Sequence, residues 1–200
     1  MSRLLPGPGT DSVVLPGKIR IIGGKWRSRK LEVIDTEDLR PTPDRVRETL
    51  FNWLRPCIEG AVCLDLYAGT GALGFEALSR GAAEVSMVDR NPVVVRALEL
   101  QAEKLGAQGL DIICADSMEW LKNCRKKYDI VFLDPPFSKM LLGKLVDQLL
   151  NCDALHRGSL LYVETDHDFK YDDTRLHVIK TGKAGVVQFM LFEHTERQTA

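Results

Sequence analysis

The stretch DLYAGTGALG, residues 65–74, ends an apolar run, AVCLDL, and precedes a segment with helical character. Its glycines form the pattern GxGxxG, and they are Gly69, Gly71 and Gly74. Glycines at these positions permit a tight turn and let a ligand approach the backbone, close to the N-terminus of the next helix. This stretch therefore predicts a strand, a ligand-binding loop and a helix, in that order.

Short apolar runs alternate with helical stretches from residue 61 onward, a rhythm typical of parallel strands joined by crossover helices. Two further β-like segments near the C-terminus are separated by the turn-forming sequence GKAG. The seven predicted strands are 61–66, 84–89, 110–116, 128–134, 158–165, 175–181 and 186–193. The sequence therefore predicts an α/β, Rossmann-like fold built on a seven-stranded sheet.

An aspartate stands at or next to the C-terminal end of each of the first four predicted strands. These residues are Asp65, Asp89, Asp116 and Asp134. Because parallel strands point the same way, we expect the four carboxylates along one edge of the sheet, where open α/β folds bind ligands. An aspartate in such a position can also simply cap the following helix, and that alternative stays open for each of them.

The spacing of these acids indicates the kind of ligand. Asp89 follows Gly71 by 18 residues, so its carboxylate can accept hydrogen bonds from a ribose diol. Asp65 stands four residues before Gly69, where it would repel a pyrophosphate but attract an ammonium or sulfonium group. S-adenosylmethionine (SAM) carries both of these cations, and Asp116 would face its adenine. The predicted cofactor-binding residues are Asp65, Tyr67, Ala68, Gly69, Thr70, Gly71, Gly74, Asp89, Arg90, Asp116, Ser117 and Met118.

The motif DPPF, residues 134–137, ends the fourth predicted strand. The carboxylate of Asp134 and the carbonyl of Pro135 can each accept an N–H from an exocyclic purine amine and so aim its lone pair at a methyl donor. Pro136 helps to fix this backbone, and Phe137 can stack on the base. The alternative is that the prolines merely end a strand and Phe137 packs in the core. We predict that these four residues are catalytic and that no metal takes part.

The N-terminal part is locally basic, although the chain has a formal net charge of −1. Residues 18–30 contain six basic residues and no acidic one. The dipeptide Gly23–Gly24, between IRII and KWRSRKLEV, predicts a hairpin over residues 19–33 with a two-residue turn. Alternation in its second strand would create a cationic face, consisting of Lys25, Arg27 and Arg29 with Trp26 behind them.

The stretch RPTPDRVRETLFNWL, residues 40–54, predicts a helix. Thr42 is expected to cap this helix, Pro43 suits its first turn, and apolar side chains recur at helical spacing. The apolar stripe consists of Val46, Leu50, Trp53 and Leu54, and the opposite face carries Arg45 and Glu48.

The combination of DLYAGTGALG, Asp89, DPPF and RPTPDRVRETLFNWL resembles the RsmD family of bacterial 16S rRNA guanine-N2 methyltransferases. IRIIGG and KAGxV extend the resemblance over about residues 18–193. The resemblance implies a class I SAM-dependent methyltransferase fold and transfer of a methyl group to the 2-amino group of a guanine in 16S rRNA. It also implies a basic N-terminal extension that helps to hold the RNA. Small departures from the family pattern are Pro43, Tyr67 and Thr70.

The expected organisation is a disordered lead-in (1–17), a basic hairpin and helix extension (18–58) and a SAM-binding catalytic domain (59–195). Basic side chains of the extension would contact phosphates of 16S rRNA or of the small ribosomal subunit. The predicted RNA-binding residues are Lys25, Trp26, Arg27, Arg29, Arg40 and Arg45. A solvated basic face without a partner is the alternative for these charges.

Rival functions fit parts of the same pattern. A DNA adenine-N6 methyltransferase would also use DPP and an aromatic residue, but it would usually carry a target-recognition insertion, for which the segment after Asp134 is short. A SAM-binding but catalytically silent RNA-binding assembly factor would share every motif. A dehydrogenase is disfavoured by Asp65 and by the lack of a substrate domain.

The composition favours a cytoplasmic protein. The five cysteines include no CxxC pair and indicate reduced core thiols. No apolar run reaches the roughly 20 residues that span a membrane. Four residues near the end of the fifth predicted strand could suggest a metal site, but solvated acids of a loop explain them better. They are Glu164, Asp166, His167 and Asp168.

Overall fold

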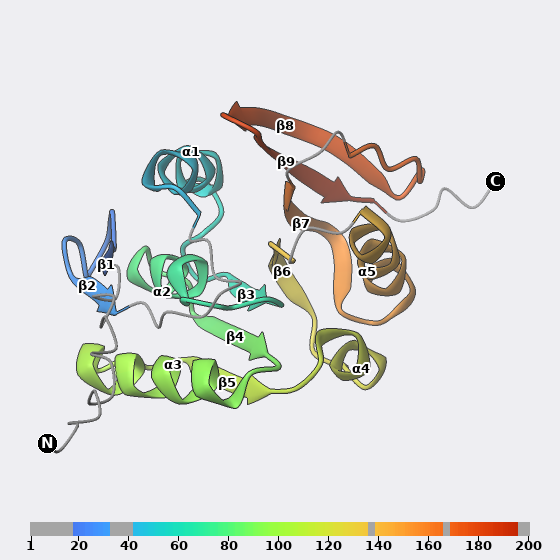
Figure 1. Cartoon of the computed structure of the whole chain (residues 1–200). Helices are drawn as coiled ribbons and strands as arrows, with labels where there is room; N and C mark the ends of the chain where they lie inside the picture. The colour runs from blue at the N-terminus through green and yellow to red at the C-terminus, as the bar shows by residue number, and fades with distance from the viewer. Residues whose placement is uncertain (1–17, 33–41, 136–138, 166–168, 196–200) are drawn as a thin grey trace, which may run out of the picture.

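A mixed sheet of seven strands forms the centre of the molecule (Figure 1), in the order β5-β4-β3-β6-β7-β9-β8. The computed structural model describes residues 18–32, 42–135, 139–165 and 169–195, so the predicted lead-in lies outside the described residues. Strands β3 to β7 run parallel, whereas β9 runs antiparallel to both β7 and β8. The strands are β3 (Val62–Asp65), β4 (Glu84–Asp89), β5 (Leu110–Cys114), β6 (Tyr128–Leu133), β7 (Leu155–Thr165), β8 (Leu176–Ala184) and β9 (Val187–His194). All seven predicted strands are present, and the predicted α/β fold is confirmed.

Helices cover both faces of the sheet. In the described parts of the chain they are α1 (Asp44–Leu54), α2 (Ala72–Ser79), α3 (Pro92–Leu105), α4 (Ser117–Lys122) and α5 (Lys139–Asn151). Helices α1, α2 and α3 lie on one face, and α4 and α5 lie on the other (Figure 1). Neighbouring residues of β6 face opposite sides of the sheet. Phe132 packs into the core under α1, α2 and α3, and Val131 packs into the core under α4 and α5. Among the described residues, no helix is long and apolar enough to cross a bilayer.

The loop between β3 and α2 requires glycine at Gly71. Its φ of 72° is left-handed, and a Cβ atom there would lie 2.6 Å from Cδ2 of Leu98 and 2.7 Å from the ring of Phe75. The chain can therefore turn from the end of β3 into α2 without displacing the core, as the GxGxxG pattern predicts.

The N-terminal hairpin differs from the predicted one. Its strands are β1 (Lys18–Arg20) and β2 (Lys30–Glu32), which pair antiparallel. Residues 21–29 connect them, instead of the predicted two-residue turn at Gly23–Gly24, and residues 25–28 form a turn instead of a strand. The prediction of an alternating cationic strand face at Lys25, Arg27 and Arg29 is therefore wrong.

A tertiary contact explains the two glycines better than a hairpin turn does. Gly24 has a φ of 75°, and a Cβ atom there would lie 1.8 Å from the carbonyl oxygen of Ser79, at the end of α2. That oxygen accepts a hydrogen bond from the backbone N–H of Lys25 at 2.7 Å, and Ser79 Oγ accepts one from the backbone N–H of Trp26 at 2.9 Å. The ring of Trp26 is 7% exposed and belongs to the core. Glycine lets the segment approach α2 this closely.

Glu76, on α2, anchors the same segment. Its fully buried carboxylate accepts the backbone N–H groups of Ile22 at 2.7 Å and Gly23 at 2.8 Å. The guanidinium of Arg80 lies 2.6 Å away, and that of Arg47, from α1, lies 3.8 Å away. The N-terminal segment therefore shares one packed body with α1 and α2, and the predicted division between residues 58 and 59 stays a prediction.

Helix α1 has the predicted apolar stripe but not the predicted cap. Val46, Leu50 and Leu54 are buried as expected. The residue before the helix is Pro43, and no side chain caps its N-terminus. The prediction that Thr42 caps the helix is therefore wrong, and its hydroxyl contacts the site described below.

Candidate active site

Three of the four predicted aspartates lie at the carboxyl ends of neighbouring strands, β4, β3 and β6, and the fourth follows β5. Asp65, the last residue of β3, is 1% exposed, and one of its oxygens accepts the backbone N–H of Gly74 at 3.2 Å. Burial raises the pKa of Asp65 to about 7; the Gly74 N–H opposes this shift, and the nearby charge of Asp89 adds to it. The carboxylates therefore form one acidic rim, as predicted.

Asp89 ties the glycine loop to the next strand. One carboxylate oxygen accepts the backbone N–H of Gly69 at 3.0 Å, and the other accepts that of Asn91 at 2.9 Å. Each oxygen still has a second lone pair, so the carboxylate can also accept hydrogen bonds from a ligand. The loop and the acid expected to hold a ribose therefore form a single hydrogen-bonded unit.

Asp116 is a helix cap, the alternative that the sequence left open. A single oxygen, Oδ1, accepts the backbone N–H groups of Met118 at 3.0 Å and Glu119 at 3.1 Å at the start of α4. Ser117 donates to the carbonyl oxygen of Leu66 and so fastens α4 to the end of β3. These contacts place the Asp116 carboxylate at the rim and fix it there, which is compatible with the predicted adenine contact.

Asp134 directly follows β6, at the centre of the rim. Oγ1 of Thr42 donates to its Oδ2 at 3.3 Å, which links the segment before α1 to the end of β6. Burial raises the pKa of Asp134 well above its ordinary value, the neighbouring acids Glu164 and Asp65 raise it further, and the Thr42 hydroxyl lowers it. Pro135 is buried beside it. The other two predicted catalytic residues, Pro136 and Phe137, lie outside the described residues.

Glu164 is the rim residue that the sequence reasoning misplaced. It was expected among solvated loop acids, yet it lies within β7, is 4% exposed and accepts a hydrogen bond from the hydroxyl of Tyr162 at 2.9 Å. Burial raises its pKa, and hydrogen bonds from Tyr162 and Thr42 oppose the shift. The signal was available in the strand alternation, since Tyr162 and Glu164 are two residues apart on one face. Asp166, His167 and Asp168 lie outside the described residues.

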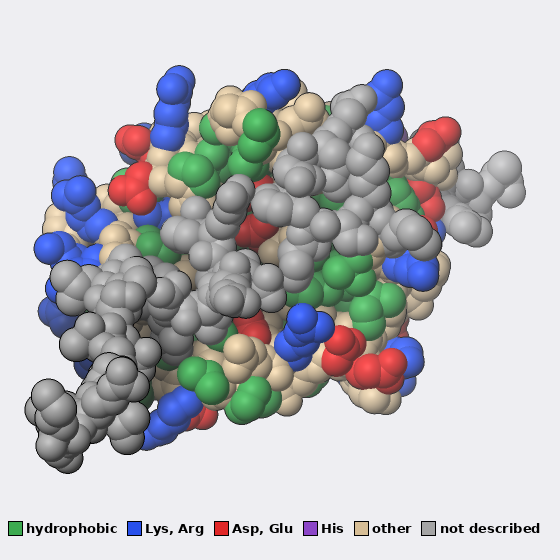
Figure 2. Space-filling model, in the orientation of Figure 1, with side chains coloured by type: hydrophobic (Ala, Val, Ile, Leu, Met, Phe, Trp, Pro, Cys, Tyr) green, Lys and Arg blue, Asp and Glu red, His purple; other side chains and the backbone are tan. Residues whose placement is uncertain are grey.

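The rim fits a cationic cofactor of the SAM type. Asp65, Asp134 and Glu164 place several carboxyl groups in a poorly solvated site, where a neighbouring positive charge would favour their ionised forms. Figure 2 shows acidic side chains near the centre of the face over the strand ends. Among the residues that the structure describes, no three His, Cys, Asp or Glu side chains could together hold a metal ion.

Comparisons with known proteins agree with this geometry. A family model described as Conserved hypothetical protein 95 matches residues 19–193. A Haemophilus influenzae protein named Ribosomal RNA small subunit methyltransferase D is 40% identical over 183 residues, which are 89% of this chain and 95% of that protein. An Escherichia coli K12 protein of the same name is 46% identical over 150 residues, 75% of this chain and 76% of that one. This chain belongs to the RsmD family.

A solved structure supports the assignment. The one described as "Putative methyltransferase yhhF from Escherichia coli" has a TM-score of 0.83 and 38% sequence identity, and the match covers 90% of this chain and 99% of that chain. The resemblance seen in the sequence is thereby confirmed. The protein is a methyltransferase, and its cofactor is SAM.

The residues predicted to bind RNA lie at two different edges of this RsmD protein. Arg45 is exposed on the first turn of α1, close to Thr42 and hence to Asp134. Lys25 and Arg27 are exposed at the far end of α2, since the backbone of Lys25 contacts Ser79.

The other RNA-binding candidates are placed as follows. Arg29 is exposed, and its guanidinium donates to the carbonyl oxygen of Lys104 at the end of α3. The burial of Trp26 makes its ring a core element, which leaves little of it for RNA. Arg40 lies outside the described residues.

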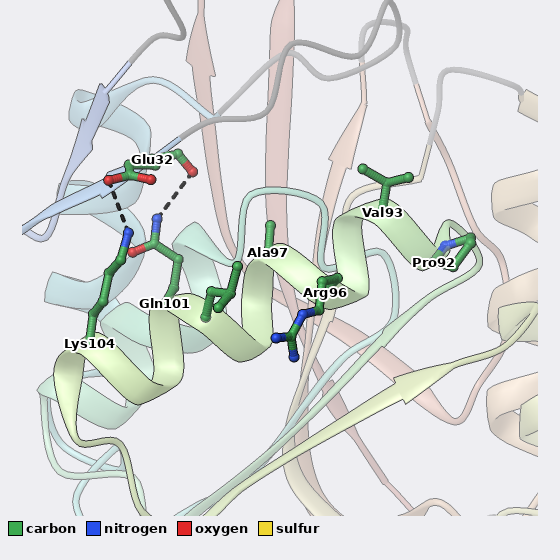
Figure 3. Close-up of a pocket in the computed structure, with 8 residues that line it drawn as sticks. Glu32, Pro92, Val93, Arg96, Ala97, Gln101 and Lys104 are labelled. Carbon is green, nitrogen blue, oxygen red and sulfur yellow. Dashed lines mark hydrogen bonds and ion pairs between the residues drawn. The ribbon is translucent and has the colours of Figure 1, made fainter.

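A surface cavity of about 510 Å³ lies along α3 and not at the acidic rim (Figure 3). Glu32 crosses one end, where its carboxylate contacts Nζ of Lys104 at 3.1 Å and its carbonyl oxygen accepts from Nε2 of Gln101 at 3.3 Å. Pro92 and Val93 line its other end. The cavity contains none of the four aspartates, so the predicted cofactor site stays at the rim.

Proposed function

We propose that this protein transfers one methyl group from SAM to the exocyclic N2 amine of a guanine in 16S rRNA of the small ribosomal subunit. The observation that carries the proposal is the position of Asp134, a hydrogen-bond acceptor held by Thr42 between Asp65 and Glu164 and followed directly by Pro135. The names of the Haemophilus influenzae and Escherichia coli relatives support the class of RNA.

The chemistry demands a hydrogen-bond acceptor at this place. The lone pair of a guanine 2-amino group is delocalised into the ring, so the amine attacks a methyl group poorly unless its N–H bonds are held. Asp134 and the carbonyl of Pro135 would each accept one N–H and direct the lone pair toward the methyl donor. SAM supplies a methyl group on a positively charged sulfur, which leaves as a neutral thioether. The nitrogen then loses one proton, to Asp134 or to water.

The rim charges give the reaction a defined pH dependence. Asp134 has a raised pKa, and its protonated carboxyl is a weaker acceptor for the amine N–H than the carboxylate is. Activity is therefore present above that pKa and lost as the pH falls through it. The positive charge of a bound sulfonium lowers the pKa of Asp134, because it favours the ionised acid, and so moves this loss of activity to lower pH.

Basic residues of the extension would hold the RNA in this proposal. Lys25, Arg27, Arg29 and Arg45 are exposed and can contact phosphates without reading sequence. Such contacts supply affinity that falls steeply with salt.

Product analysis tests the proposal. The protein is incubated with methyl-labelled SAM and small subunits from a strain that lacks the modification, and the rRNA is digested to nucleosides. We expect the label in N2-methylguanosine. Label in N6-methyladenine of added DNA would instead support the adenine-N6 alternative, and SAM binding without transfer to any nucleic acid would support the silent assembly factor.

A further inference from the structure

The tip of the β8–β9 hairpin lies at the same edge of the sheet as the acidic rim. Because β9 is antiparallel to both β7 and β8, the end of β8 and the start of β9 lie at the same edge of the sheet as the end of β7. Gln188 pairs with Thr165 of β7 on one side and with Lys183 of β8 on the other. Two strand spacings separate Lys183 from Thr165, or about 10 Å. The tip, residues 180–188, is therefore a neighbour of Glu164 and Asp134.

The tip is cationic and exposes an apolar side chain. Lys180 and Lys183 are exposed, and residues 174–192 include no acidic residue. Val186, in the turn, is 71% exposed, and Val178 on β8 is 52% exposed. In Figure 2, Lys and Arg side chains project along the upper margin of this face, where Figure 1 places β8. Lysines on an edge strand also prevent pairing between sheets, and single exposed valines are common on surfaces, so the position of the tip beside the rim carries the argument.

Packing holds the tip rigidly beside the rim. Gly182 lies under the ring of Phe189, where a Cβ atom would come within 2.2 Å of the ring. Phe189 in turn lies against Trp53 of α1, with ring centroids 5.3 Å apart. Phe189 also pairs with Glu164 across the β7–β9 ladder. The hairpin and the rim are therefore parts of one packed unit, and a ligand that spans both meets a preformed surface.

The N-terminal turn that carries Lys25 and Arg27 has no such position. It contacts Ser79 at the end of α2, whereas the rim lies at the start of α2. The eight residues of α2 separate the two ends by about 12 Å. RNA bound at the N-terminal turn therefore reaches the reacting base only with further contacts nearer the rim, and Arg45 is one such contact.

We propose that the β8–β9 tip binds the rRNA strand next to the target guanine. Lys180 and Lys183, which lie on opposite faces of β8 because they are three residues apart, contact its phosphates from the two sides of the tip. Val186 packs on the apolar face of a neighbouring base or ribose. The inference rests on the proposed function, because it assumes that the substrate at the rim is RNA. Charge complementarity and continuity with the rim favour RNA over a second protein as the occupant.

The test compares matched pairs of substitutions in the full chain. Lys180→Ala with Lys183→Ala removes two charges at the tip, and Lys127→Ala with Lys144→Ala removes two exposed charges elsewhere. Affinity for an rRNA fragment is titrated at several salt concentrations, and methyl transfer is measured over a range of RNA concentrations. SAM affinity and thermal unfolding show whether each variant is folded.

The tip pair is expected to weaken RNA binding about tenfold more than the control pair. It should also reduce the slope of log affinity against log salt by about 1.5, as the loss of two phosphate contacts requires. KM for RNA should rise far more than kcat falls. Val186→Ser should weaken binding without changing the salt slope, because it removes an apolar contact and no charge.

Three results would overturn the inference. Tip and control pairs with equal RNA affinity and KM, in a wild-type protein that methylates rRNA, would refute the tip and leave the proposed function standing. A wild-type dimer that Val186→Ser converts to a monomer, with RNA affinity unchanged, would make the tip an interface between copies of this chain. A wild-type protein that binds no RNA would refute both proposals, before any variant is compared.

Discussion

Two acidic sites in this molecule differ in how many hydrogen-bond donors the described residues supply to them. The carboxylate of Glu76 accepts two backbone N–H groups and the guanidinium of Arg80, with Arg47 nearby. Asp134 receives one hydrogen bond from the described residues, at 3.3 Å from Thr42, and faces other acids. A buried charge with a full set of donors is a structural anchor, whereas one with few donors is suited to receive a cation or an amine from a ligand.

Removal of the anchor should give the largest effect. Glu76→Ala removes the acid that contacts Arg80, leaves the buried guanidinium of Arg47 with Asp44 as its acidic partner, and frees the backbone of the N-terminal segment. We expect a loss of about 3–5 kcal/mol in the free energy of unfolding, measured by denaturant titration. Glu119→Ala, which breaks an exposed ion pair with Lys122, is the control and should cost less than about 1 kcal/mol. Equal losses for the two variants would refute the anchor.

Asp134→Ala should act on turnover and hardly on folding. We expect kcat to fall on the order of 100-fold or more, because an acceptor aimed at the reacting amine is lost, while SAM affinity stays nearly normal. Single-turnover kinetics and cofactor titration measure the two. Asp153→Ala, at an exposed acid, is the control. A parallel loss of SAM affinity would contradict the assigned role.

Asp134→Asn separates two roles of the same carboxylate. The amide keeps one acceptor oxygen, so activity should lie well above that of Asp134→Ala if the residue mainly aims the amine. Rates equal to those of Asp134→Ala would show that the carboxylate is needed to take up the proton.

Local sequence patterns predicted the features that depend only on the direction of the strands and on the spacing of apolar residues. The glycine loop, the seven strands and the acidic rim follow from apolar runs that end in aspartate. Patterns failed where a partner from a distant part of the chain decides the role of a residue. Thr42 contacts Asp134, 92 residues away, instead of capping its own helix.

The other two failures have the same origin. Gly24 is needed because its segment lies against the carbonyl of Ser79, and not because a hairpin turns there. Glu164 resembled a solvated loop acid, but it lies within β7, pairs with Phe189 of β9 and is buried. Contacts with elements that are distant in sequence have no local signature, so the sequence could not place Thr42 and Gly24. For Glu164 the strand alternation with Tyr162 did offer a signal.

Glu164→Gln tests whether the neighbouring acids of the rim raise the pKa of Asp134. The charge of Glu164 raises the pKa of Asp134, so its removal should lower that pKa and move the acid limb of the kcat/KM profile to lower pH. Glutamine can still accept from the Tyr162 hydroxyl. Glu193→Gln, at an exposed position of β9, is the control. An acid limb that stays in place would show that the two acids do not interact.

Charge reversal at the N-terminal turn should have the smallest effect on catalysis. Arg27→Glu with Arg29→Glu should weaken RNA binding and flatten its salt dependence, while SAM affinity and kcat at saturating RNA stay unchanged. Unchanged RNA titrations would mean that this turn, although anchored by Glu76, does not contact the RNA.

Calorimetry of SAM binding tests most directly whether the buried rim acids become ionised when a cationic cofactor binds. Titrations at pH 6.5 in buffers of different ionisation enthalpy give the number of protons exchanged. Burial raises the pKa of Asp65 to about 7, so this carboxyl is about three-quarters protonated at pH 6.5 in the free protein. Because a sulfonium favours the ionised acid, SAM binding should release up to about three-quarters of a proton from it. Asp65→Asn should reduce the release. No proton exchange, or proton uptake, would contradict the account.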